Sequence, residues 1–139
     1  MIIESEAEML AFGKNLSGQL RVGNWVAIDG PLGAGKTVLC AGILQGLGFI
    51  GEVASPSYAI VHQYGPPEVS IPVVHADLYR LNDSDEIEEL GLLDASNDCI
   101  TLIEWAKNAS EGFGNPTHQI IIHQMDNGNR QITMTMMHG

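Results

Sequence analysis

The feature that most constrains this chain is a glycine-rich loop between an apolar run and a helical segment. Residues Gly30 to Thr37 read GPLGAGKT and fit the pattern G-x-x-x-x-G-K-[ST]. The apolar run Asn24 to Asp29 before the loop is typical of a buried strand, and Lys36 to Leu47 after it has helical spacing and ends at Gly48. A strand, a glycine loop and a helix in this order predict an anion site, because backbone N–H groups and the helix N-terminus point at the same place.

Each fixed position of this loop predicts a contact with a polyphosphate. Glycines let backbone N–H groups approach phosphate oxygens, Lys36 can reach the β and γ oxygens, and the Thr37 hydroxyl can ligate Mg²⁺. Guanine specificity lacks support, because neither an Asn-Lys-x-Asp nor an Asp-x-x-Gly sequence occurs. A small-molecule kinase usually adds a lid with several arginines, whereas only three basic residues follow the loop, Arg80, Lys107 and Arg130. We therefore expect a nucleoside triphosphatase and keep a small-molecule kinase as the alternative.

Composition narrows the possible partners and compartments. The chain has 139 residues and a net charge of −11, which disfavours extended nucleic-acid binding by this chain alone. No apolar stretch is long enough to span a membrane, the N-terminus has no secretory signal pattern, and two cysteines are too few for a disulfide framework. We expect a cytosolic protein in which residues 1–139 form a single domain.

The periodicity of the remaining segments predicts an α/β fold. Apolar residues between Ile2 and Leu20 follow a helical period, with Ser5 placed to cap an acidic first turn. Another acidic helix is expected over Ser84 to Leu93. Further strands are expected at Tyr58 to Tyr64, Pro72 to Asp77, Cys99 to Trp105, Gln119 to Gln124 and Gln131 to Met136, the last two joined by a hairpin turn. Helices interspersed with strands predict a three-layer α/β domain with a mixed sheet, of the phosphate-loop nucleoside-triphosphatase type.

Two carboxylates stand where ligands of open α/β sheets bind, at the carboxyl ends of predicted strands. Asp77 ends an apolar run and is a candidate for orienting water or supporting a metal, or is simply a turn residue. Glu104 ends the apolar run that begins at Ile100. Spacing alone leaves open which of the two would touch a metal ion.

Three further blocks of sequence carry a resemblance to a known family. They are Ser55-Pro56-Ser57-Tyr58, His75-Ala76-Asp77-Leu78-Tyr79-Arg80-Leu81 and Glu104-Trp105. Together with the glycine loop, and in the same order, they resemble the bacterial TsaE (YjeE) family over roughly Ser5 to Arg130. Two departures are visible, since Ser57 stands where the family usually has Thr, and Met9 stands where an N-terminal Thr is common.

The resemblance implies roles for residues of this chain. It makes Glu104 a Mg²⁺ ligand alongside Thr37. From the residues themselves we take Lys36, Asp77 and Glu104 as the catalytic candidates, with Asp77 orienting or activating water. The Ser55 to Tyr58 loop is either a switch that senses the γ-phosphate or a turn before a strand. The nucleotide-binding candidates are Ser5, Gly30, Leu32, Gly33, Ala34, Gly35, Lys36, Thr37 and Val38, and the switch candidates are Ser55, Pro56, Ser57 and Tyr58.

The resemblance also implies a function. Members of this family are ATPases that work with TsaD and TsaB in making N6-threonylcarbamoyladenosine at position 37 of tRNA, so ATP and Mg²⁺ are the expected cofactors. We expect tRNA to bind the assembled complex and not this chain alone. Six of the twelve residues from Asp83 to Asp94 are acidic, and they form either a solvated helix face or a contact with a basic partner. A nucleotide-gated binding module is the alternative from a different functional class.

Overall fold

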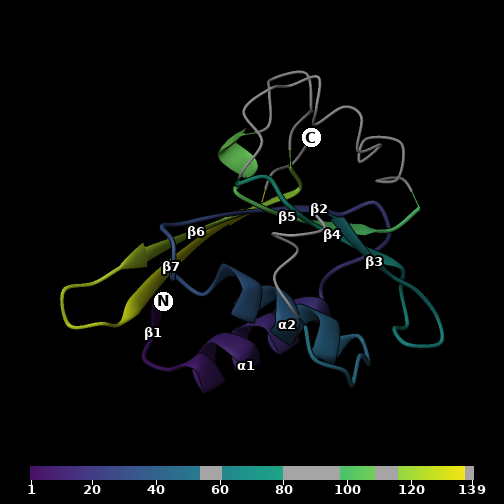
Figure 1. Cartoon of the computed structure of the whole chain (residues 1–139), viewed down its shortest axis with the longest axis horizontal. Helices are drawn as coiled ribbons and strands as arrows, with labels where there is room; N and C mark the ends of the chain where they lie inside the picture. Colours follow the sequence, from purple (N-terminus) through teal and green to yellow (C-terminus); the bar gives the residue numbers. More distant parts are fainter. Residues whose placement is uncertain (54–60, 80–97, 109–115, 137–139) are drawn as a thin grey trace.

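The computed structural model of the chain describes residues 1–53, 61–79, 98–108 and 116–136. Within these residues, seven strands form one sheet, accompanied by two α-helices and one short 3-10 helix (Figure 1). No helix in this part of the chain is long and apolar enough to cross a membrane. The strands are β1 Ile2–Ile3, β2 Trp25–Asp29, β3 Val61–Tyr64, β4 Val73–Asp77, β5 Ile100–Glu104, β6 His118–Gln124 and β7 Arg130–Met136, and the helices are α1 Glu6–Ser17, α2 Lys36–Gly46 and the 3-10 helix η1 Ala106–Asn108.

The sheet is mixed, and its parallel centre determines where the functional residues meet. Its strand order is β1-β7-β6-β2-β5-β4-β3. The strands β6, β2, β5 and β4 run parallel, while β3, β7 and β1 are antiparallel to their neighbours. Register places Glu104 opposite both Ile28 and Asp77. The carboxyl ends of β2, β4 and β5 therefore lie side by side at one edge, as the α/β prediction requires.

Both α-helices lie on the same face of the sheet (Figure 1), packed closely against each other. Two glycines make this close approach possible, because a Cβ atom on Gly13 would lie 2.5 Å from the Leu39 carbonyl oxygen and one on Gly42 would lie 2.4 Å from the Leu10 oxygen. The start of α1 is set by Ser5, whose hydroxyl accepts a hydrogen bond from the Glu8 N–H at 3.2 Å.

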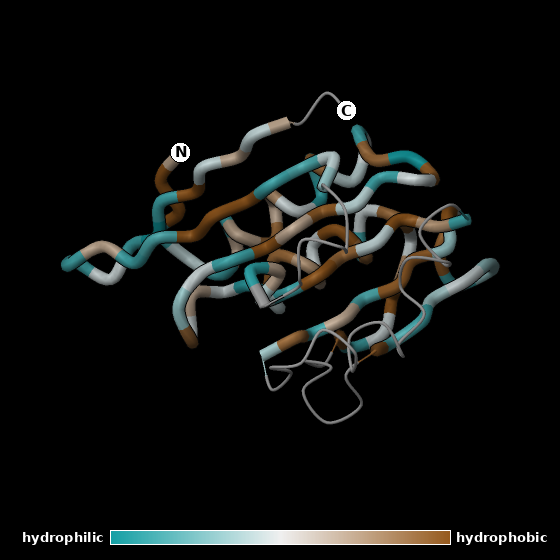
Figure 2. The backbone as a smooth tube through the Cα atoms, turned by 90° about the horizontal axis from the view of Figure 1, so that it is seen from above, coloured by the Kyte–Doolittle hydropathy of each residue, from teal (hydrophilic) through white to brown (hydrophobic). Residues whose placement is uncertain are grey.

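Alternating side chains of the central strands bury both faces of the sheet. Val26 and Ile28 of β2 pack into the core under the helices, whereas Trp25 and Ala27 join a second core on the opposite face. The apolar stretches of these strands run through the middle of the molecule (Figure 2). The second face also carries η1, while the predicted helix over Ser84 to Leu93 lies outside the described residues.

The first residues of the chain differ from expectation. The helix predicted within Ile2 to Leu20 is confirmed as α1, with Ser5 as its N-cap as expected, but it ends at Ser17, and Ile2–Ile3 before the cap form β1, which pairs with the edge of β7. Edge pairing with a strand more than a hundred residues away cannot be read from local periodicity. The remaining predicted strands agree with the described ones to within one or two residues, except that β3 is described only from Val61.

Candidate functional site

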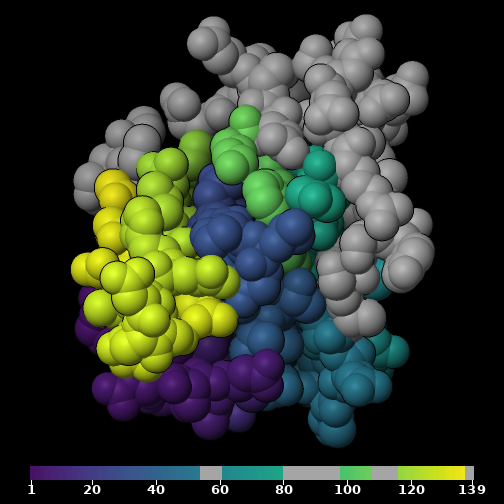
Figure 3. All heavy atoms as spheres, turned by 60° about the vertical axis from the view of Figure 1, so that its left-hand side comes forward, coloured from purple at the N-terminus to yellow at the C-terminus, as the bar shows by residue number. Residues whose placement is uncertain are grey.

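The glycine loop joins β2 to α2 and lies at the surface between the β6–β7 hairpin and the segment around η1 (Figure 3). Gly33 and Gly35 have φ angles of 76° and 100°, which favour glycine because a side chain would be strained there. At Gly30 a Cβ atom would lie 2.8 Å from the Ile122 carbonyl oxygen. The three glycines of the loop are therefore required by the conformation and packing of the turn itself.

A cavity of about 480 Å³ opens beside this loop. It is lined by loop residues 32–38, by the two strand-end carboxylates Asp77 and Glu104, and by Glu6, Tyr79 and Trp105. A smaller cavity of about 140 Å³ adjoins it, and its lining includes Ser5 and Met9 of the α1 start together with loop residues. Elements far apart in the sequence thus converge on one hollow at the carboxyl edge of the sheet.

Lys36 is the only basic residue among the described residues that line the larger cavity. Its side chain is 5 % exposed, and its Nζ donates hydrogen bonds to the carbonyl oxygens of Gly30 at 2.7 Å and Pro31 at 2.8 Å. Burial lowers the pKa of Lys36, while the nearby carboxylates of Glu104 and Asp77 oppose that shift. A cation whose present acceptors are neutral carbonyls is well placed to transfer its hydrogen bonds to phosphate oxygens.

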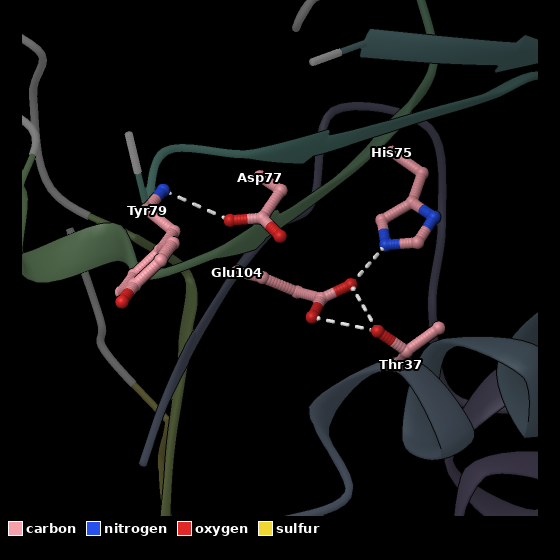
Figure 4. Close-up of polar contacts among 5 residues, drawn as sticks. All are labelled: Thr37, His75, Asp77, Tyr79 and Glu104. Atoms are coloured by element: carbon pink, nitrogen blue, oxygen red, sulfur yellow. Dashed lines mark hydrogen bonds and ion pairs between the residues drawn. The ribbon is translucent and has the colours of Figure 1, made fainter. Parts of the chain in front are cut away.

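The Thr37 hydroxyl and the Glu104 carboxylate are joined directly (Figure 4). Thr37 Oγ1 donates to Glu104 Oε1 at 3.0 Å and lies 3.2 Å from Oε2. On its other side, Glu104 is hydrogen-bonded to Nε2 of His75 at 2.5 Å. The site therefore brings together a hydroxyl and a carboxylate, which are the oxygen donors that Mg²⁺ prefers.

Asp77 lies next to Glu104 on the neighbouring strand (Figure 4). Its Oδ1 accepts a hydrogen bond from the Tyr79 backbone N–H at 2.9 Å. Desolvation raises the pKa of Asp77, the Tyr79 N–H opposes this, and the Glu104 charge raises it further. Because Asp77 lines the cavity at the end of its strand, its position suits a group that faces substrate or water.

Trp105 packs over the site. Its ring centroid lies 4.4 Å from Lys36 Nζ, 4.8 Å from Lys107 Nζ and 4.8 Å from the Tyr79 ring centroid. The φ angle of Trp105 is 57°, a left-handed conformation that costs a non-glycine residue about 1–2 kcal/mol. This backbone turn directly after Glu104 places the indole over the lysine.

Arg130 is a site residue that sequence reasoning missed. From the start of β7, its guanidinium donates to the carbonyl oxygens of Ala34 at 3.1 Å, Gly33 at 3.0 Å and Gly128 at 2.5 Å. It therefore links the glycine loop to the hairpin turn. The only signal in the sequence is that Arg130 is the sole basic residue after Lys107.

The Arg130→Ala variant is expected to bind nucleotide about tenfold more weakly, because the loop loses its link to the hairpin and must be ordered by the ligand. Titration calorimetry with ATP and Mg²⁺ measures this directly. Arg130→Lys keeps the charge without the planar fork and should recover only part of the affinity. The matched control is Arg21→Ala, which removes an exposed arginine away from the loop. Unchanged affinity in Arg130→Ala would show that the loop needs no such link.

Some predicted site residues are not described by the structure. The switch candidates Ser55, Pro56, Ser57 and Tyr58, as well as Arg80 and the acidic segment Asp83 to Asp94, lie outside the described residues. Of the predicted nucleotide contacts, Ser5 caps α1 and lines the smaller cavity, and Leu32 is exposed on the rim of the larger one. The other predicted contacts lie in the loop or at the start of α2, and of these only Gly30 does not itself line the larger cavity.

A glycine loop between a parallel strand and a helix, with its lysine and threonine facing a strand-end carboxylate, defines a phosphate-loop nucleotide-binding protein of the α/β class. Comparison with known proteins narrows this class. The family model described as threonylcarbamoyl adenosine biosynthesis protein TsaE matches residues 3–132. The chain belongs to the TsaE family, which acts in the biosynthesis of threonylcarbamoyladenosine in tRNA.

Individual relatives agree with this assignment over most of their length. The chain is 43 % identical over 111 residues to the tRNA threonylcarbamoyladenosine biosynthesis protein TsaE of Haemophilus influenzae, covering 76 % of this chain and 69 % of that protein. It is 34 % identical over 137 residues to the TsaE of Rickettsia bellii, covering 96 % and 92 %. The crystal structure of Bacillus subtilis YdiB superposes with a TM-score of 0.80 at 27 % identity, covering 98 % of this chain and 83 % of that one.

Proposed function

We propose that this chain binds ATP with Mg²⁺ in the cavity beside the glycine loop and hydrolyses it to ADP and phosphate in support of tRNA N6-threonylcarbamoyladenosine formation. The observation that carries the proposal is the hydrogen-bonded pair of Thr37 and Glu104 beside Lys36. This arrangement offers one cation for phosphate charge and two kinds of oxygen donor for a hard cation.

The donor set fits Mg²⁺. Thr37 and Glu104 would hold the ion, and both line the same cavity as the loop. An ion held there would supply positive charge that offsets the negative charge of the phosphates. The hydroxyl hydrogen that Thr37 now donates to Glu104 would turn away, so that the oxygens of both side chains face the ion.

Each remaining residue of the site has a role in this proposal. The backbone N–H groups of the loop and the start of α2 bind the phosphates, and Lys36 contributes charge-assisted hydrogen bonds to the β and γ oxygens. Asp77 orients the attacking water. Its position beside Glu104 at the cavity wall supports this role. Ser5 and Met9 border the smaller adjoining cavity and are candidates for the nucleoside side of the ligand.

The proposed ATPase acts together with partner proteins. Among the described residues that line the larger cavity, Lys36 is the only basic one, and the Arg130 guanidinium is bound to backbone carbonyl oxygens of Gly33, Ala34 and Gly128. A phosphate-loop enzyme without an arginine directed at the transferred phosphoryl group is slow by factors of about 10³ to 10⁵. We propose that TsaD and TsaB raise this rate, with the Ser55 to Tyr58 loop and the acidic Asp83 to Asp94 segment as contact or gating regions. A net charge of −11 supports tRNA binding by the assembly rather than by this chain alone.

The fate of the γ-phosphoryl group distinguishes this proposal from a kinase. With ATP labelled in the γ position, the full chain incubated with TsaD, TsaB and tRNA should release all label as inorganic phosphate, in a one-to-one ratio with ADP. Label found on a small-molecule acceptor would instead establish a kinase. Partner binding that depends on ATP while no phosphate is released would establish a nucleotide-gated binding module.

Replacing Glu104 tests the proposed metal site. Glu104→Gln keeps the shape of the side chain and an acceptor for Thr37, but removes the negative charge that attracts the ion. We expect the Mg²⁺ concentration needed for half-maximal ATP binding to rise at least about tenfold. Glu68→Gln removes an exposed carboxylate away from the cavity and is the matched control. A magnesium titration that is the same for Glu104→Gln and the wild type would exclude Glu104 as a ligand.

A further inference from the structure

Three buried side chains of different chemistry meet beside the glycine loop. The thiol of Cys40, the imidazole of His75 and the carboxylate of Glu104 offer ligand atoms that all lie within 4.8 Å of one another. Their exposed fractions are 0 %, 0 % and 2 %. Cys40 lies on α2, one turn after Thr37, while His75 and Glu104 come from the adjacent strands β4 and β5. We propose that these three residues form a binding site for a divalent transition-metal ion of the zinc type.

The donor set is selective for this class of ion. A thiolate and an imidazole are preferred by borderline-soft ions such as Zn²⁺ and Co²⁺, whereas Mg²⁺ takes oxygen donors. Charge also matters because the site is buried: one thiolate and one carboxylate together neutralise a dication. The cluster of Cys40, His75 and Glu104 therefore favours an ion of the zinc type, whereas the oxygen donors of Thr37 and Glu104 favour Mg²⁺.

The proton balance of binding can be followed at each ligand. The buried Cys40 thiol loses its proton to solvent as the metal–sulfur bond forms. Nε2 of His75 can bind a metal only without a proton on that atom, in the tautomer that carries the ring N–H on Nδ1. No hydrogen-bond partner of Nδ1 is found within the described residues, so adopting this tautomer breaks no bond there. The metal takes the place of the hydrogen bond that now joins His75 to Glu104.

The geometry requires only small movements. Bonds of about 2.3 Å to sulfur and about 2.0–2.2 Å to nitrogen and oxygen place tetrahedral ligand atoms roughly 3.3–3.6 Å apart. His75 Nε2 and Glu104 Oε2, at 2.5 Å, must separate, and atoms near the 4.8 Å limit must approach. Glu104 also lines the open cavity, which supplies a path for the ion and room for a water as fourth ligand.

Such a site would regulate the protein. Glu104 cannot serve both ions at once, so the transition metal would compete with Mg²⁺ for this carboxylate. This consequence rests on the proposed function, whereas the metal site itself does not. No local pattern in the sequence points to this cluster, because the approach of Cys40 and His75 to Glu104 depends on how α2 packs on the sheet.

Cobalt provides a direct test, because a Co²⁺–thiolate bond gives a charge-transfer absorption band in the near ultraviolet. The full chain, reduced and without nucleotide, should develop this band with one equivalent of Co²⁺ and lose it when Zn²⁺ is added. Cys40→Ser and Cys40→Ala should both abolish the band. Two different replacements are used so that the result does not depend on one variant that fails to fold. The matched control is Cys99→Ser, which changes the other buried cysteine in the core on the opposite face of the sheet and should keep the band.

The outcomes are distinct. A wild-type protein without the band, a band that survives in Cys40→Ser, or one lost in Cys99→Ser would each overturn the proposal while leaving the ATP site untested. If the site is correct, a tenfold increase in Mg²⁺ should raise by about tenfold the Zn²⁺ concentration that halves ATP binding in the wild type. In Cys40→Ser, the same Zn²⁺ concentrations should leave ATP binding unchanged. Inhibition by Zn²⁺ that is equal in both proteins would contradict competition at this site.

Discussion

Lys36→Ala is expected to weaken the binding of ATP with Mg²⁺ at least about a hundredfold, a loss near 2.7 kcal/mol. The physical reason is that Lys36 is the only basic residue among the described residues lining the cavity, and it is almost fully buried, so its charge is little screened. The fold should survive, because the Nζ hydrogen bonds end on loop carbonyls at the cavity edge. Titration calorimetry gives the affinity and circular dichroism checks the fold.

Lys14→Ala is the control for this experiment, since it removes an exposed lysine from α1 on the helix side of the sheet. It should leave the affinity unchanged. Lys36→Arg keeps the charge but places a larger, planar group between two carbonyls, and should bind ATP with an affinity between those of Lys36→Ala and the wild type. An affinity in Lys36→Ala equal to that of the wild type would exclude this cavity as the nucleotide site.

Asp77→Asn is expected to reduce phosphate release by a factor of about 10² to 10⁴ while ATP affinity changes by less than about threefold. The reason is that Asp77 is proposed to orient water from the cavity wall, whereas Lys36 and the loop N–H groups are proposed to bind the phosphates. The amide keeps an oxygen that can accept the Tyr79 N–H. Steady-state phosphate release and calorimetry on the same samples separate the two effects.

The same substitution should stabilise the protein at neutral pH. Burial raises the folded-state pKa of Asp77 above its unfolded value, so its favourable contribution is fully present below the unfolded pKa and is lost as pH rises through the folded pKa. Removing the charge should therefore raise the melting temperature at about pH 7, by an amount that shrinks toward pH 4. A variant that loses both activity and stability would point to a structural role for Asp77 instead.

Local patterns in the sequence predict most of the fold. The glycine loop, its flanking strand and helix, and the terminal hairpin all carry short-range signals, and the structure has them where the signals lie. The strand β1 could not be predicted in this way, because a strand of two residues has no periodicity and forms only by pairing with the edge of β7. The order of the central strands is likewise set by long-range packing and not by any local pattern.

In the candidate site, too, local sequence predicts some residues, whereas others depend on long-range packing. Lys36 and Thr37 follow from the loop motif, and Asp77 and Glu104 follow from their positions at strand ends. Sequence spacing could not decide between the two carboxylates, and the hydrogen bonds from Thr37 to Glu104 now favour Glu104 as the proposed metal ligand. The link from Arg130 to the loop needs the three-dimensional arrangement, because 96 residues separate it from Ala34.

Phosphate release from ATP tests the central claim most directly, measured for the full chain alone and with TsaD and TsaB present. We expect slow, Mg²⁺-dependent release by the chain alone, a clear increase when both partners are added, and loss of both rates in Lys36→Ala. A rate that is already maximal without partners would contradict the proposed gating. The claim of an ATPase site would fail if Lys36→Ala and the wild type released phosphate at the same rate under every condition.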